Sequence, residues 1–130
     1  MISAEDNALR GARSSEVKDS GRVRKGAFMP RKDGQDRDGL SVSIETPVLA
    51  TSHRAKYETS GHRTCLVQVR SVRAVPVVPS LDVKEDADED DPAHALIVGI
   101  PDPTLGSENL RQAEFVAGEL AKRARPYLWP

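Results

Sequence analysis

The side chains of this 130-residue chain best suited to acid–base, nucleophilic or metal chemistry are three histidines and one cysteine. His94 follows Pro92 and directly precedes the apolar run ALIVGI, so it stands at the start of an expected buried strand. An imidazole titrates near neutral pH, so His94 can act as a general acid or base, with Asp38 or Asp102 as its orienting carboxylate. A histidine that only caps the strand edge is the alternative, and both interpretations stay open.

A Cys–His pair is present in the stretch GHRTC. His62 and Cys65, together with His53, have the side chains for a metal site or a nucleophile pair. Residues three apart in a strand point to opposite faces, however, and Cys65 alternates with Val67 and Val69. We therefore interpret Cys65 as a small buried hydrophobe, and we expect no metal site and no cofactor. A single cysteine also excludes an intramolecular disulfide.

The turn PDPTLGSEN connects the apolar run to the best helical pattern of the chain. Backbone N–H groups around Gly106 and Ser107 stand at the amino end of that helix, where they can meet an anion. A plain strand–helix connection capped by the Ser107 hydroxyl is the alternative.

The last residues, PYLWP, extend beyond the helical pattern. Tyrosine and tryptophan often anchor protein interfaces. A short apolar tail either folds back onto its own core or docks on another chain. Tyr127, Leu128 and Trp129 are therefore candidate interface residues.

The formal net charge of −1 hides a strong asymmetry. Residues 1–75 contain 14 Lys+Arg and 9 Asp+Glu, whereas residues 76–130 contain 5 and 11. Residues 10–37 hold nine basic and four acidic side chains, a pattern typical of loose polyanion binding. Phe28 is the only aromatic residue in that stretch and the pI is near 6.3, so a dedicated nucleic-acid binder is not favoured. The alternatives to anion binding are that the basic and acidic parts of the chain attract each other within the fold, or that both are solvated surface segments.

The pattern of apolar residues along the chain predicts the strands that position these candidate residues. Alternation over 40–45 and over 64–70 predicts two half-buried strands. The continuous apolar run 95–100 predicts a central strand covered on both faces. The β-branched stretch 75–79 contains two prolines, which limit it to an edge strand or an extended connector.

Helical spacing is clearest over 107–125, where apolar residues recur every three or four positions. Weaker patterns indicate helices over 3–13 and 47–58. The polar, Asp-Gly-containing stretch 30–39 and the acidic stretch 82–92 are expected to be loops.

These elements predict a single α+β domain over 1–130. We expect a small mixed or antiparallel sheet of about 4–5 strands, with the C-terminal amphipathic helix packed on one face. No apolar run reaches the ~20 residues that a membrane span requires, and the amino end carries no apolar signal segment. We therefore expect a cytoplasmic protein with no membrane partner.

The segments GAFMPR, DGLSVSI, HALIVGIP and LAKRAR resemble a set of small uncharacterised bacterial proteins over most of the chain. DGLSV and HALIVGIP are the specific part of that resemblance. It implies a stand-alone cytoplasmic bacterial protein, with no assigned reaction and no catalytic residues to carry over. It also implies that Asp38, Gly39, Ser41 and His94 share one site.

Three functions follow from these observations. The leading hypothesis is a non-catalytic protein-interaction module that binds a protein partner, or a second copy of itself, through the Trp129 end or a sheet edge. The alternative is a small enzyme or binding domain for an anionic small molecule, with His94 as its acid–base group. The third is loose nucleic-acid binding by residues 10–37.

Overall fold

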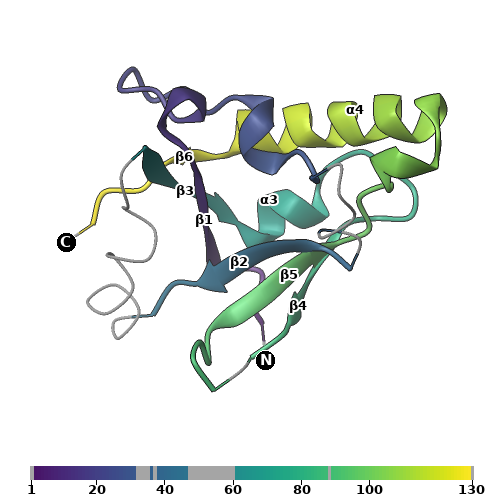
Figure 1. The fold of residues 1–130 in the computed structure, drawn as a ribbon. Helices are drawn as coiled ribbons and strands as arrows, with labels where there is room; N and C mark the ends of the chain where they lie inside the picture. The colour runs from purple at the N-terminus through teal and green to yellow at the C-terminus, as the bar shows by residue number, and fades with distance from the viewer. Residues whose placement is uncertain (1, 32–35, 37, 47–60, 88, 130) are drawn as a thin grey trace.

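The computed structural model describes residues 2–31, 36, 38–46, 61–87 and 89–129. That part of the chain is an α+β fold built on one open antiparallel sheet of six strands, in the order β4-β5-β2-β1-β3-β6 (Figure 1). The α+β class is confirmed, and the sheet is larger than the 4–5 strands expected. No helix in these ranges combines the length and the apolar character needed to cross a bilayer.

The elements have the following bounds. The strands are β1 (Asn7–Arg13), β2 (Leu40–Ile44), β3 (His62–Gln68), β4 (Asp82–Glu85), β5 (His94–Val98) and β6 (Arg125–Pro126). The helices are α3 (Val69–Arg73) and α4 (Ser107–Arg123), with the 3-10 turns η1 (Ser14–Glu16), η2 (Lys25–Phe28) and η3 (Pro103–Leu105).

The main core lies between one face of the sheet and the layer formed by α4, α3 and η2 (Figure 1). Val116 and Leu120 of α4 are fully buried against this face, and Phe28 of η2 fills the space beside them. Burying each side chain of this size stabilises the fold by about 1.5–3 kcal/mol. The apolar residues that recur every three or four positions in the sequence of α4 are therefore the residues that the helix buries against the sheet.

Periodicity located β2, the middle of β3 and α4. The strand expected over 64–70 is corrected in two respects, because residues 69 and 70 belong to α3 and because Thr64–Val67 are buried on both faces of the sheet and not on one. The strand expected over 95–100 exists as β5, but its burial alternates instead of being complete on both faces. The helix layer covers one face only, so Ala95 and Ile97 are fully buried while the residues between them are partly exposed. The helix expected over 47–58 lies outside the described residues.

The helix expected over 3–13 is wrong, because Asn7–Arg13 form β1 in the middle of the sheet. Ser3 and Asp6 are good helix-capping residues, but here they close a turn. The Ser3 backbone N–H donates to Asp6 Oδ2 at 2.7 Å, and the Asp6 N–H donates to the Ser3 carbonyl at 3.0 Å. Short polar side chains that bond the local backbone favour turns as readily as helix starts.

Two further expectations are corrected. Asp82–Glu85, expected within an acidic loop, form the edge strand β4, in which Asp82 accepts a 2.8 Å hydrogen bond from Arg73 Nε. That hydrogen bond is the main cause that lowers the pKa of Asp82, so its charge is compensated within the strand. Of the two alternatives for residues 75–79, the edge strand is not formed among the described elements, and these residues instead connect α3 to β4 through bends, with a cis peptide bond before Pro79.

The Asp-Gly step before β2 is required by close packing. Gly39 has a φ of +143°, and a Cβ there would lie 2.8 Å from the Ile97 carbonyl oxygen and 2.9 Å from Leu96 Cβ. The backbones of β2 and β5 can pair at Leu40↔Ile97 only if residue 39 has no side chain.

We expect Gly39→Ala to lower the free energy of unfolding by more than about 1 kcal/mol, because it adds both backbone strain and a contact with β5. Gly106→Ala is the matched control, since Gly106 has a φ of +138° with nothing within 4 Å of its Cβ position. Urea unfolding of both variants separates the two causes. An equal loss in both would show that strain alone, and not the approach to β5, requires glycine at position 39.

Candidate functional site

The two central strands β1 and β2 pair at only two positions, Ala8↔Ile44 and Leu9↔Ser43, and then diverge (Figure 1). The side chain of Arg10 bridges the gap between them. Its Nε donates to the Ala27 carbonyl at 2.6 Å, and its Nη1 donates to the Ser41 carbonyl at 2.8 Å. One side chain therefore connects β1 to η2 and to β2.

A hollow of about 450 Å³ opens where the strands diverge. We call it the inter-strand hollow, and the charged or titratable residues that line it are Arg10, Arg13, Glu16, Arg31, Asp36 and His62. Its lining combines three guanidinium groups with two carboxylates and one imidazole. This composition suits the binding of an oxyanion, which arginine forks recognise through paired hydrogen bonds.

Arg31 and Asp36 form the most constrained pair in the inter-strand hollow. Arg31 Nε and Nη2 each lie 3.2 Å from an Asp36 carboxylate oxygen, and the Arg31 backbone N–H donates to Asp36 Oδ2 at 2.7 Å. Burial is the largest single influence on this carboxyl and favours its neutral form. The hydrogen bonds and charge of Arg31 outweigh burial and hold the pKa of Asp36 below its ordinary value.

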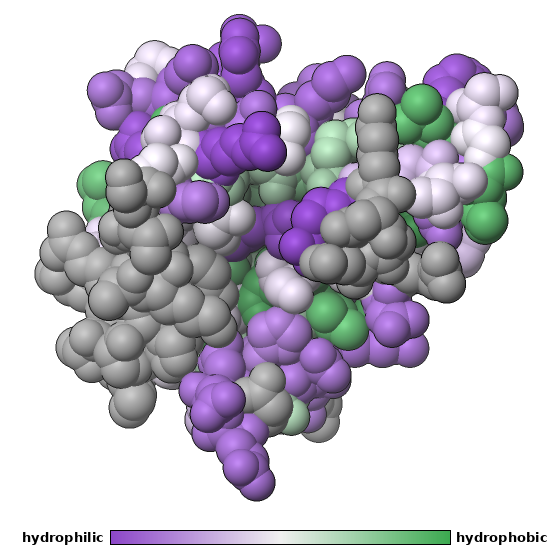
Figure 2. All heavy atoms as spheres, viewed as in Figure 1, coloured by the Kyte–Doolittle hydropathy of each residue, from purple (hydrophilic) through white to green (hydrophobic). Residues whose placement is uncertain are grey.

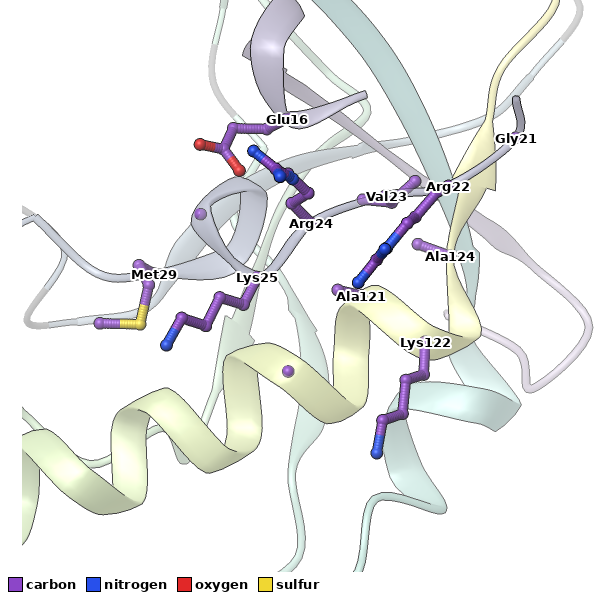
Figure 3. Close-up of a pocket in the computed structure, with 12 residues that line it drawn as sticks. Glu16, Gly21, Arg22, Val23, Arg24, Lys25, Met29, Ala121, Lys122 and Ala124 are labelled. Atoms are coloured by element: carbon purple, nitrogen blue, oxygen red, sulfur yellow. The ribbon is translucent and has the colours of Figure 1, made fainter. Parts of the chain in front are cut away.

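A second concavity, of about 670 Å³, lies between residues 21–29 and the carboxyl half of α4 (Figure 3). We call it the helix groove. Its apolar lining comes from small or flexible residues, namely Val23, Met29, Gly118, Ala121 and Ala124. Its cations are Arg22, Arg24, Lys25 and Lys122. A volume of this size is in the range of small-molecule sites.

The cations of the helix groove differ in what they already bind. Lys25 Nζ lies 3.7 Å from Glu114, and Lys122 Nζ lies 3.0 Å from Glu119. Within the described part of the chain, by contrast, the guanidinium groups of Arg13, Arg22 and Arg24 have no hydrogen-bond or ion-pair partner.

In the groove, Arg22 reaches toward Ala121, while Arg24 points toward the side where Glu16 lies (Figure 3). The viewed face of the molecule is mostly hydrophilic, with its apolar side chains in small separate patches (Figure 2).

The inter-strand hollow and the helix groove adjoin, because Glu16, Gly26 and Met29 line both. At this junction the Glu16 carboxylate lies against the backbone of Gly26. A Cβ at residue 26 would be 2.5 Å from Glu16 Cδ, so a larger residue there would displace the Glu16 carboxylate from this place. The junction therefore carries one carboxylate between two groups of cations.

The candidate acid–base residues do not gather in one place. His94 Nδ1 lies 3.0 Å from Asp86 Oδ2, and its side chain is 17% exposed. His94 pairs with Ser43 at one end of the β2–β5 pair. Asp38 precedes β2 and Asp102 follows β5, so both lie beyond the opposite end, roughly 13 Å away along the strands. The geometry thus gives His94 a carboxylate neighbour, but that neighbour is Asp86.

The same register bears on the site that the resemblance implies for Asp38, Gly39, Ser41 and His94. Asp38 and Gly39 precede β2, whereas His94 pairs with Ser43 near its other end. Ser41 pairs with Leu96, and its carbonyl is engaged by Arg10. The structure therefore spreads these four residues along the strand pair.

The strand–helix turn is occupied by its own capping contacts. Asp102 Oδ1 accepts from the Thr104 N–H at 2.9 Å and from the Thr104 hydroxyl at 2.7 Å, which starts η3. Gly106 takes the N-cap position of α4 with no side-chain cap, and Ser107 is the first helical residue. The expected capping role of Ser107 is therefore corrected. Gly106 and Ser107 are both exposed at the amino end of α4.

The C-terminal tail lies back on the sheet face opposite α4. The Tyr127 N–H donates to the Thr64 carbonyl at 2.9 Å, and Trp129 Nε1 lies 3.2 Å from Thr64 Oγ1. The rings of Tyr127 and Trp129 meet edge to face, with centroids 4.9 Å apart. Burial, followed by a hydrogen bond and charge from Glu45, raises the pKa of Tyr127 to about 12. Leu128, between these two anchors, is 84% exposed.

Cys65 is fully buried in the main core, as its alternation with Val67 indicates. Burial raises the pKa of its thiol to about 12, which disfavours the reactive thiolate. His62 is exposed and lines the inter-strand hollow. His53 lies outside the described residues, among which no cluster of three metal-ligating side chains occurs.

Sequence reasoning identified the basic stretch 10–37 but not the individual residues that matter. Arg10, Arg13 and Glu16 could have been found only by assigning β1 correctly. The contribution of α4 to the helix groove required the tertiary fold, because no local pattern connects residues 118–124 with residues 21–29.

Comparisons with protein-family models, with curated proteins and with solved structures found no match to this chain. The resemblance to small bacterial proteins accordingly stays a prediction.

We expect Asp36→Asn to remove a pH-dependent part of the stability. Because the folded pKa of Asp36 is lowered, its contribution is present above the unfolded pKa of about 4 and is lost as the pH falls. The difference in unfolding free energy between the natural chain and the variant should be largest near pH 7 and should shrink in acid. Asp38→Asn, at an exposed neighbouring position, is the control. A difference that does not vary with pH would contradict the role of the Arg31 pair.

Proposed function

We propose that this protein binds a phosphate-bearing or similar oxyanionic ligand in the inter-strand hollow. The observation that supports this most is the lining of the hollow itself, where Arg13, whose guanidinium has no partner among the described residues, stands with Arg10 and Arg31. Guanidinium groups that converge on a hollow produce a positive potential, which raises the local concentration of anions.

Preformed geometry supports the same proposal. Arg10 and Arg31 are held in place by hydrogen bonds before any ligand arrives. Positioned donors cost less conformational entropy on binding than free side chains do. Asp36 adds little repulsion, since Arg31 already compensates its charge.

The alternative of a small enzyme with His94 as its acid–base group has less support. Its proposed partners Asp38 and Asp102 lie at the other end of the strand pair, and His94 lines neither the inter-strand hollow nor the helix groove. Binding without catalysis is the simpler account of the residues that do converge.

Isothermal titration with inorganic pyrophosphate and with ADP at low ionic strength tests the proposal. We expect Arg13→Ala to weaken binding about tenfold or more, because a charge-assisted hydrogen bond is lost and no internal contact is disturbed. Lys84→Ala is the matched control, since it removes one exposed positive charge from the distant edge strand β4. Absence of binding, or equal effects of both substitutions, would refute the proposal.

Protein interaction through the C-terminal tail is a second candidate function. Its support is Leu128, an exposed leucine presented between two side chains that are anchored on the sheet. A fixed apolar side chain can enter a pocket on a partner without first being ordered. A second copy of this chain is the partner we propose.

We expect the natural chain to self-associate weakly at high concentration, and Leu128→Ser to stay monomeric in sedimentation velocity. The substitution should change the unfolding free energy by less than about 0.5 kcal/mol, because Leu128 makes little contact with the core. A natural chain that stays monomeric at every concentration would exclude this interface.

A further inference from the structure

The inter-strand hollow and the helix groove adjoin at Glu16, Gly26 and Met29, which line both, and we call the two concavities together the track. Cations stand on both sides of the shared stretch. Arg13 lies at the inter-strand end, and Arg22 and Arg24 lie along the helix groove. A ligand with a single anionic group would use only part of this arrangement.

The residues that line the two concavities indicate which parts of a longer anion they could contact. Among the described residues, neither concavity is lined by an aromatic side chain, so stacking of bases on protein rings is not available. On the α4 side, the small residues Gly118, Ala121 and Ala124 form a shallow apolar surface instead. Contacts along the track would therefore be made to the backbone of the ligand, with little dependence on its sequence.

The shape of the track favours a flexible strand. Both sites are concave, the helix groove between residues 21–29 and α4 and the inter-strand hollow beside β1 and η2, whereas direct readout of duplex DNA needs an element that protrudes into a groove. Adjacent phosphates of an extended single strand can follow cations that are spaced along a furrow.

We propose that the ligand is single-stranded nucleic acid, whose phosphodiester backbone follows the track from Arg13 to Arg22. This inference rests on the proposed oxyanion site and extends it with the helix groove. Arg13 contacts one phosphate in the inter-strand hollow, and Arg22 and Arg24 contact others along α4.

Fluorescence anisotropy with labelled twelve-nucleotide oligouridine and oligothymidine tests this inference. We expect the double variant Arg22→Ala/Arg24→Ala to weaken oligonucleotide binding about tenfold or more. It should also reduce the slope of log K against log salt by about 1.4, since each phosphate contact on a single strand contributes about 0.7. Pyrophosphate binding should be unchanged in this variant, and Lys84→Ala should leave both kinds of binding unchanged.

The outcomes separate the two proposals. If pyrophosphate binds but the oligonucleotides bind no more tightly than pyrophosphate, the track is refuted and the oxyanion site stands. If Arg13→Ala affects neither ligand, both proposals fail. If an oligoglutamate peptide of equal charge binds as tightly as the oligonucleotides, an acidic protein segment replaces nucleic acid as the ligand. Circular dichroism of the double variant controls for folding, and we expect no change because both side chains are exposed and neither has a partner within the described part of the chain.

Discussion

The guanidinium of Arg10 is the interaction on which the arrangement of this fold depends. β1 and β2 separate after two paired positions, and the carbonyls of Ala27 and Ser41 face the gap that results. Arg10 donates to both. A hydrogen bond from a charged donor contributes about 1.5–3 kcal/mol, so this one side chain ties β1 to both η2 and β2. A long side chain with several donors is therefore well suited to this position in the split sheet.

The same interaction determines the character of the hollow. A gap between central strands would ordinarily be filled by apolar side chains, but a gap bridged by arginine keeps a positive charge at its base. Arg31 is fixed by Asp36, whereas Arg13, Arg22 and Arg24 stay without partners in the described residues. The fixed cations Arg10 and Arg31 define the shape of the hollow. The other arginines lose side-chain freedom when a ligand orders them.

The parts of the fold that could be predicted are β2 and α4, which have strict periodicity, and the position of β5, which a continuous apolar run marks although only one of its faces is buried. β1 was missed because its neighbours Ser3 and Asp6 are equally suited to a turn and to a helix cap. β4 was missed because its acidic residues repel each other locally. A tertiary contact from Arg73 on α3 compensates Asp82, and no local pattern shows it.

The candidate site was harder to predict because its charges come from distant segments and nearly cancel in the total. A net charge of −1 argues against anion binding only if both signs act at the same place. In the fold, the acidic turn between β4 and β5 lies two to three strands from β1, a separation of roughly 10–14 Å at the usual strand spacing. The screening length at physiological salt is about 8 Å. The basic track and the acidic turn therefore act as independent surfaces, and an approaching anion meets the local excess of arginine and not the average.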